Sequence, residues 1–148
     1  MASNIPDGVM GFRQNPVSYS LVAVSLALYG VSLALPTAVC GDLKSYRGYE
    51  VLEIGLFGLL TLDPRWFANI GYGVMVVSAL RISSDKAWIA TFWAVILATP
   101  TLFIPFLGCA AMDHPEWSEA LGPGAYFWIA AIWVAALAVL IRPSYLPE

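Results

Sequence analysis

The sequence predicts an all-α fold: an integral membrane bundle of four transmembrane helices, with a short interfacial helix in the first outer loop. Two observations predict it. Of the 148 residues, 59% are hydrophobic and only 11% are charged, whereas a soluble domain carries about 25% charged residues. Several apolar runs also approach the roughly 20 residues that a helix needs to cross a hydrocarbon core about 30 Å thick. We therefore expect a polar N-terminal arm (1–16), a single transmembrane domain (17–142) and a short C-terminal tail (143–148).

The four spans are expected at about 17–39, 64–82, 87–107 and 125–141. The first run has no charge, and its Pro36 stands where the helix should be ending. Asp63 and Pro64 form a helix-start signal, because Asp caps free N–H groups and Pro fits the first helical turn. The polar turn at 83–86 leaves room only for an antiparallel hairpin. Arg142 and Pro143 close the last span.

The segment 48–66, GYEVLEIGLFGLLTLDPRW, is expected to form the interfacial helix over about 49–62. About a dozen helical residues rise only about 18 Å, which is too short for a span. Glu50 and Glu53 would also be costly at membrane depth. On a helical wheel they share one side opposite the leucines, so the helix should lie in the interface plane. Gly55 and Gly58 would let it approach a neighbouring helix closely.

Four crossings place both chain termini on the same side of the membrane. With the termini in the cytoplasm, four basic residues lie inside and three outside, which agrees with the positive-inside rule. The inside set is Arg13, Arg81, Lys86 and Arg142, and the outside set is Lys44, Arg47 and Arg65. We therefore expect an integral protein of the bacterial inner (plasma) membrane with cytoplasmic termini.

This topology places Cys40 and Cys109 at the same outer surface, where two alternatives stay open. An oxidising exterior permits a disulfide if the two Cα atoms approach within about 7 Å. Otherwise, both residues act as small, partly buried hydrophobes. No C-x-x-C pair is present to activate a thiol.

The third loop carries the only histidine, within four residues that resemble a metal cluster: Asp113, His114, Glu116 and Glu119. Their spacing matches no recognised ligand pattern. Asp113 followed by Glu116 three positions later instead fits a capping box at the start of a short helix. We therefore expect no metal.

Catalytic chemistry is not expected either. The chain offers no nucleophile, base and orienting group in one set, no glycine-rich phosphate loop and no histidine pair for haem. We predict no enzyme activity, no catalytic residue and no cofactor. The net charge of −3 without a basic tract argues against nucleic acid as a partner.

Three short patterns resemble a group of small, uncharacterised bacterial inner-membrane proteins. They are Gly48-Tyr49-Glu50-x-Leu52-x-x-Gly55-x-x-Gly58, Trp66-Phe67-Ala68-Asn69 and Leu121-Gly122-Pro123-Gly124-x-Tyr126-x-Trp128. That group has Trp where this chain has Tyr49, and Pro where it has Ile70. The resemblance implies the same helical membrane architecture and carries no activity.

Contact with another protein is the function that the sequence favours. Little polarity lies within the expected spans, and small residues recur along the first and last of them, either for a partner or for internal packing: Ala23, Ala27, Gly30 and Ala34; Ala131, Ala135 and Ala138. The chain would then be an accessory subunit or assembly factor of a larger membrane complex, bound to the lipid bilayer and to another integral membrane protein or to copies of itself. An immunity-type binder of a membrane-acting toxin is an alternative.

The other alternative is a small ion, proton or solute pathway that uses Glu53 and the Pro-kinked third span. Asn69 would line that path, although interhelical hydrogen bonding is its more ordinary role. The candidate partner or pathway contacts are Glu50, Glu53, Gly55, Gly58, Trp66 and Asn69.

Overall fold

The computed structural model describes residues 16–40, 44–61, 64–80, 86–102 and 120–141. Its helices are α1 (Pro16–Ala34), α2 (Gly48–Thr61), α3 (Pro64–Leu80), α4 (Lys86–Ala98), the 3-10 helix η1 (Thr99–Leu102) and α6 (Pro123–Leu140). Its strands are β1 (Pro36–Cys40), β2 (Lys44–Arg47) and β3 (Ala120–Leu121). The mostly helical fold predicted from the sequence is confirmed.

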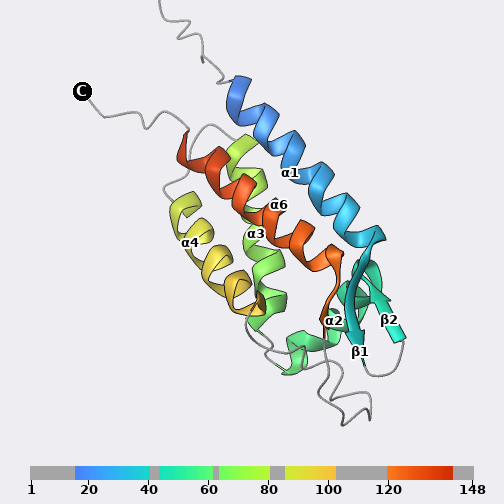
Figure 1. The fold of residues 1–148 in the computed structure, drawn as a ribbon. Helices are drawn as coiled ribbons and strands as arrows, with labels where there is room; N and C mark the ends of the chain where they lie inside the picture. The colour runs from blue at the N-terminus through green and yellow to red at the C-terminus, as the bar shows by residue number, and fades with distance from the viewer. Residues whose placement is uncertain (1–15, 41–43, 62–63, 81–85, 103–119, 142–148) are drawn as a thin grey trace, which may run out of the picture.

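α1, α3, α4 and α6 run side by side in alternating directions (Figure 1). α1 packs most extensively against α6, and α3 against α4, while α6 also contacts both α3 and α4. The beginning of α1 and the end of α6 lie at one end of this bundle, and the sheet and α2 lie at the other (Figure 1). α1 and α6 are the two described helices that are long and apolar enough to cross a membrane, whereas α3 and α4 contain shorter apolar segments, Trp66–Leu80 and Trp88–Ala98.

A small antiparallel sheet, in the order β2-β1-β3, occupies the α2 end of the bundle. β1 pairs with β2 from Pro36 opposite Arg47 to Cys40 opposite Lys44. It pairs with β3 through Ala38 opposite Leu121. The sheet therefore joins the segments that follow α1, precede α2 and precede α6.

The first expected span was too long at its C-terminal end, because α1 stops at Ala34 and residues 36–40 form β1. Pro36 has no N–H to continue the helical ladder, and it disfavours helical geometry at the preceding residue. Backbone groups that no longer take part in helical hydrogen bonds are paired in the sheet or beside it. For example, the Gly48 N–H donates to the Leu35 carbonyl at 3.0 Å.

The third expected span is α-helical only as far as Ala98, and it then tightens into η1. Pro100 cannot donate the α-helical hydrogen bond, which is the reason for the expected kink. Thr99 Oγ donates to the Val95 carbonyl at 2.7 Å, one turn back. Residues 103–107 of that span lie outside the described residues.

The other expected helices agree closely with the structure. α2 and α3 begin at Gly48 and Pro64, within a residue of the expected starts. α6 begins at Pro123, two residues earlier than expected, with Gly122 as its N-cap. Ala120 and Leu121, near the end of the expected third loop, form β3.

The core of the bundle consists mainly of small side chains. Its buried residues include eight alanines and three serines: Ala68, Ala79, Ala94, Ala98, Ala131, Ala135, Ala136, Ala138, Ser18, Ser25 and Ser32. Met75 and Ile132 are the largest fully buried side chains among the described residues. Small residues allow helix backbones to approach closely, so the bundle is held by tight backbone contact.

Candidate functional site

A network of polar side chains, called here the interhelical network, joins three helices inside the bundle. It consists of Ser25 and Tyr29 on α1, Asn69 and Tyr72 on α3, and Trp128 on α6. The Tyr29 and Tyr72 rings stack in parallel, with their centroids 4.7 Å apart. Polar contact and ring stacking therefore fix α3 against α1.

Ser25 lies at the middle of α1 and is fully buried. Its Oγ donates to the Ala131 carbonyl on α6 at 2.7 Å, and it lies 3.0 Å from the Tyr72 hydroxyl. A serine hydroxyl has one hydrogen, and a carbonyl oxygen can only accept. Tyr72 must therefore donate to Ser25, and the chain of donors runs from α3 through α1 to α6.

Asn69 is the second centre of the network. Its Oδ1 accepts hydrogen bonds from Tyr29 Oη at 3.1 Å and from Trp128 Nε1 at 2.8 Å. Because an indole N–H can only donate, the contact with Trp128 identifies the amide oxygen. Asn69 thus makes interhelical hydrogen bonds, which is the more ordinary role expected from the sequence. Its contact with a partner, or its place in a pathway, stays a prediction.

Serines also join α1 directly to α6. Ser18 and Ser25, seven residues apart, donate to the carbonyls of Ala138 and Ala131, also seven residues apart, at 2.8 and 2.7 Å. Ser32 continues the same spacing and is buried. This seven-residue repeat of serines is the sequence signal for the α1–α6 contact, and it was not among the predicted features.

Two candidate residues, Gly55 and Trp66, meet between α2 and α3. A Cβ added to Gly55 would lie 2.5 Å from Trp66 Cδ1, so the indole packs directly on the glycine backbone. Trp66 Nε1 is buried and has no hydrogen-bond acceptor among the described residues. Glycine at position 55 therefore makes room for the indole, in agreement with the expected close approach at this position.

Glu50 has a local structural role at the start of α2. Its Oε2 accepts a hydrogen bond from the Arg47 backbone N–H at 2.7 Å, and its Oε1 accepts one from Tyr49 Oη at 3.3 Å. A carboxylate that reaches back to the residue before the helix is one half of a capping box. Glu53 is exposed, and no hydrogen bond or ion pair engages it within the described residues.

The remaining candidates are only partly covered by the structure. Gly58 lies within α2, and Cys40 is the last residue of β1. Cys109 and the third-loop acidic and histidine residues lie outside the described residues, so the disulfide stays a prediction. No group of three or more potential metal ligands occurs within the described ranges.

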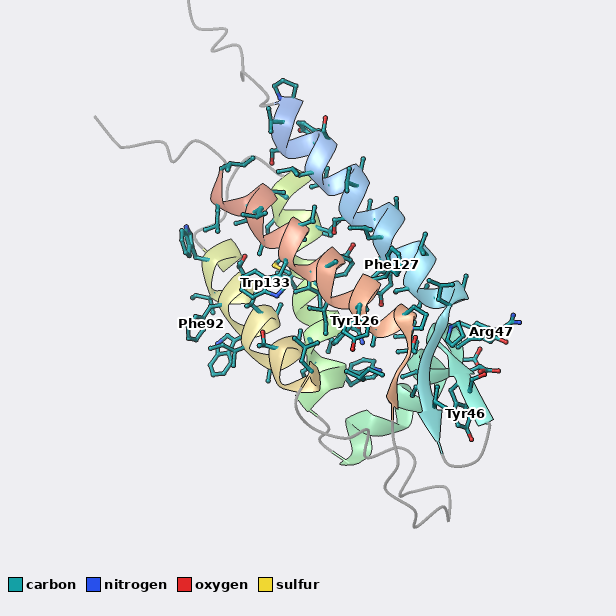
Figure 2. The ribbon with its side chains drawn as sticks, in the orientation of Figure 1. Tyr46, Arg47, Phe92, Tyr126, Phe127 and Trp133 are labelled. Atoms are coloured by element: carbon teal, nitrogen blue, oxygen red, sulfur yellow. The ribbon has the colours of Figure 1, made fainter. Side chains whose placement is uncertain are left out.

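The outer surface of the bundle is a second candidate site, because it is covered by large apolar side chains. On α4 these are Trp88, Ile89, Phe92, Trp93 and Ile96, and on α6 they are Tyr126, Phe127, Trp133, Leu137 and Leu140. Figure 2 shows Phe92 projecting away from the bundle and Trp133 on the side of α6 that faces α4. Trp93 and Trp133 are 53% and 48% exposed. These two helices therefore present aromatic surface to their surroundings.

Comparisons with protein-family models, curated proteins and solved structures give no match to this chain. The resemblance drawn from its motifs stays a prediction. The interhelical network and the apolar outer surface are therefore the two structural features that bear on function.

The small residues expected to line helix contacts divide into two groups. Ala131, Ala135 and Ala138 are buried in the core. The α1 set, Ala23, Ala27, Gly30 and Ala34, is exposed, and a Cβ added to Gly30 would meet no atom within 4 Å. The α6 residues therefore serve internal packing, whereas the α1 residues lie on the outer surface.

Proposed function

We propose that this chain is an integral membrane protein with four spans that acts by contact with another membrane protein, as an accessory subunit or assembly factor. The observation that carries the proposal is the distribution of side-chain size. The helices bury mainly alanine and serine, and they expose many valine, leucine, isoleucine, phenylalanine and tryptophan side chains.

This distribution fits a lipid solvent better than water. Soluble monomers rarely expose contiguous apolar patches larger than a few hundred Å². In a bilayer, lipid tails solvate large apolar side chains, and helices associate through small residues and interhelical hydrogen bonds. The alanine contacts and the Ser18 and Ser25 hydrogen bonds between α1 and α6 are interactions of that kind.

Helix length supports four spans. At 1.5 Å per residue, α1 with 19 residues is about 29 Å long, α6 with 18 about 27 Å and α3 with 17 about 26 Å. α4 with 13 residues adds about 20 Å, and the four residues of η1 add about 8 Å. All four lengths approach the roughly 30 Å of a hydrocarbon core.

Two tryptophans support contact with a protein partner. Trp93 is next to the midpoint of Lys86–Leu102, and Trp133 is within two residues of the midpoint of α6. Tryptophan normally occupies the membrane–water interface, where its N–H finds an acceptor. At mid-depth, lipid tails offer none, whereas a partner helix supplies both acceptors and packing surface. Buried tryptophans are also common energetic centres of protein interfaces.

Co-purification of the full chain from its native membrane in mild detergent tests this function. A stoichiometric partner identified by mass spectrometry is expected, and its recovery should fall at least tenfold in the double variant Trp93→Leu, Trp133→Leu. Trp88→Leu is the matched control, because Trp88 is exposed near the helix start and is expected at the interface. Recovery of a lone monomer, or equal loss in the control, would refute the proposal.

We further place the protein in the bacterial inner membrane with both termini in the cytoplasm. The support is the distribution of basic residues, together with the shared end of the bundle at which α1 begins and α6 ends (Figure 1). Labelling Cys40 in intact cells with a membrane-impermeant maleimide, after reduction, tests this orientation. If Cys40 is labelled only after the cells are opened, the opposite orientation holds, with both termini outside.

A further inference from the structure

The side-chain nitrogen of Asn69 has no acceptor within the described part of the chain. The two hydrogen bonds of this residue both end on Oδ1, from Tyr29 and from Trp128. Nδ2 carries two hydrogens, and an amide nitrogen can only donate them. Half of the hydrogen-bonding capacity of the amide is thus left for a group outside the interhelical network.

Flipping the amide does not remove this unused donor. If the oxygen and nitrogen exchanged places, Trp128 Nε1 would face another N–H donor at 2.8 Å. The indole contact therefore holds Nδ2 on the side away from Trp128. Asn69 is half-buried, so a group from outside the chain can reach the amide.

The position of Asn69 along α3 sets the kind of environment from which that group comes. It lies five residues after Pro64, so it is about 8 Å along the helix from the end that carries α2 and the sheet. For a helix that spans the hydrocarbon core, this depth lies about 8 Å inside one boundary, where water no longer satisfies polar groups. An amide donor at that depth requires an acceptor from a membrane component.

The chemistry of the neighbours selects a neutral acceptor. The side chains in hydrogen-bond contact with the amide are Tyr29 and Trp128, and the following residue, Ile70, is exposed and apolar. A neutral donor between aromatic and aliphatic groups suits an uncharged carbonyl oxygen, because a phosphate would lose its hydration without gaining a cation.

We propose that Asn69 Nδ2 binds the carbonyl oxygen of a bilayer amphiphile, held beside α3 with its apolar tail along the outer surface of the bundle. This inference rests on the membrane insertion proposed above. Two membrane components supply such an oxygen, the ester groups of a phospholipid and the ring carbonyls of a lipid quinone.

Solid-state NMR on the full chain in vesicles tests the contact directly. The sequence has three asparagines, Asn4, Asn15 and Asn69, so ¹⁵N-asparagine labelling gives three side-chain amide signals. Vesicles of diester phosphatidylcholine with ¹³C-labelled carbonyls form one arm. Vesicles of diether phosphatidylcholine, which has no carbonyl, form the second, and the same diether vesicles with ¹³C-carbonyl ubiquinone form the third.

Magnetisation transfer from Asn69 Nδ2 to a labelled carbonyl is expected in the diester or the quinone arm, and the arm that shows it identifies the source. The signal is assigned by its loss in Asn69→Leu. Tyr29→Phe is the matched control, because it removes one bond to Oδ1 and keeps Trp128, so the carbonyl contact should persist. The contact itself is measured on the unmodified chain and does not depend on the folding of a variant.

Absence of transfer in both the diester arm and the quinone arm would overturn the inference. In ¹³C-labelled protein with unlabelled lipid, transfer from Asn69 Nδ2 to a carbonyl of another residue, beyond its own bonded Cγ, would also overturn it. Flotation of the vesicles with the protein is checked first. Failure to float would refute the membrane proposal and this inference with it, whereas flotation without transfer would refute only the inference.

Discussion

Replacing Ser25 by alanine should destabilise the bundle more than the loss of one hydroxyl normally does. Ser25 is fully buried and takes part in two interhelical hydrogen bonds, with Tyr72 and with the Ala131 carbonyl. Such bonds contribute about 0.6 kcal/mol each in membrane proteins. The variant also leaves the Tyr72 hydroxyl, in a residue that is 5% exposed, without an acceptor, which costs about 1 kcal/mol more. The expected loss is about 2 kcal/mol in the free energy of unfolding.

The double variant supplies the sharper test. Tyr72→Phe alone removes one hydrogen bond and should cost about 0.6 kcal/mol. Ser25→Ala combined with Tyr72→Phe loses both bonds but leaves no orphaned hydroxyl, so it should cost only about 1.2 kcal/mol. Adding the second substitution should therefore restore stability relative to Ser25→Ala.

Reversible unfolding by dodecyl sulfate in mixed micelles, followed by far-ultraviolet circular dichroism, measures these differences. Ser20→Ala is the matched control on the same helix. Ser20 is exposed, and its hydroxyl donates to the Pro16 carbonyl one turn back in α1, at 3.0 Å. It should change stability by less than about 0.5 kcal/mol. Additive losses in the double variant, or a Ser25 effect no larger than the Ser20 effect, would refute the reasoning.

Two further predictions compare neighbouring residues of the same type. Gly71→Ala places a Cβ 2.7 Å from the Ala94 Cβ and 3.1 Å from its Cα, so α3 and α4 must separate, at a cost of about 1–3 kcal/mol in the same unfolding assay. Glu50→Ala removes the acceptor of the Arg47 N–H, so hydrogen exchange of that amide should accelerate about fivefold, which corresponds to about 1 kcal/mol.

Each of these changes has a control in the chain. A Cβ on Gly73 meets no atom within 4 Å, so Gly73→Ala should leave stability unchanged or raise it by up to about 1 kcal/mol. Glu53→Ala, on the same helix as Glu50, should not alter the exchange of the Arg47 amide. Equal effects of the two glycines, or of the two glutamates, would contradict the packing and capping described here.

Helix positions were predictable where a residue type enforces a boundary. Pro64 begins α3, and the short apolar segment before it forms α2. The strand β1 was not predictable in the same way, because hydrophobicity alone does not separate the end of a buried helix from a short strand. β1 exists because Ala38 pairs with Tyr46 and Leu121, and the second of these partners is remote in the sequence.

The candidate site was predictable only in part. Asn69 stood out because a carboxamide within an apolar segment needs partners, and the structure supplies two. The contact of Ser25 with Tyr72 was not predicted, because it depends on which face of α1 turns inward. Small residues occur on both faces of α1, so residue size does not distinguish the inner face from the outer one. The buried serine hydroxyls require carbonyl acceptors, and they therefore mark the inner face.

The pairing of β1 with β3 has a consequence for the order in which the protein assembles. It joins Ala38 to Leu121, whereas α3 and α4 are separated by only five residues, 81–85. Contacts between near neighbours form faster than contacts that must close a long loop. α3 and α4 should therefore pair early. α6 should join α1 last, when β3 pairs with β1 and completes the sheet. The slow step of maturation then belongs to the final helix, so a chain interrupted before it would expose the serine face of α1 without its natural cover.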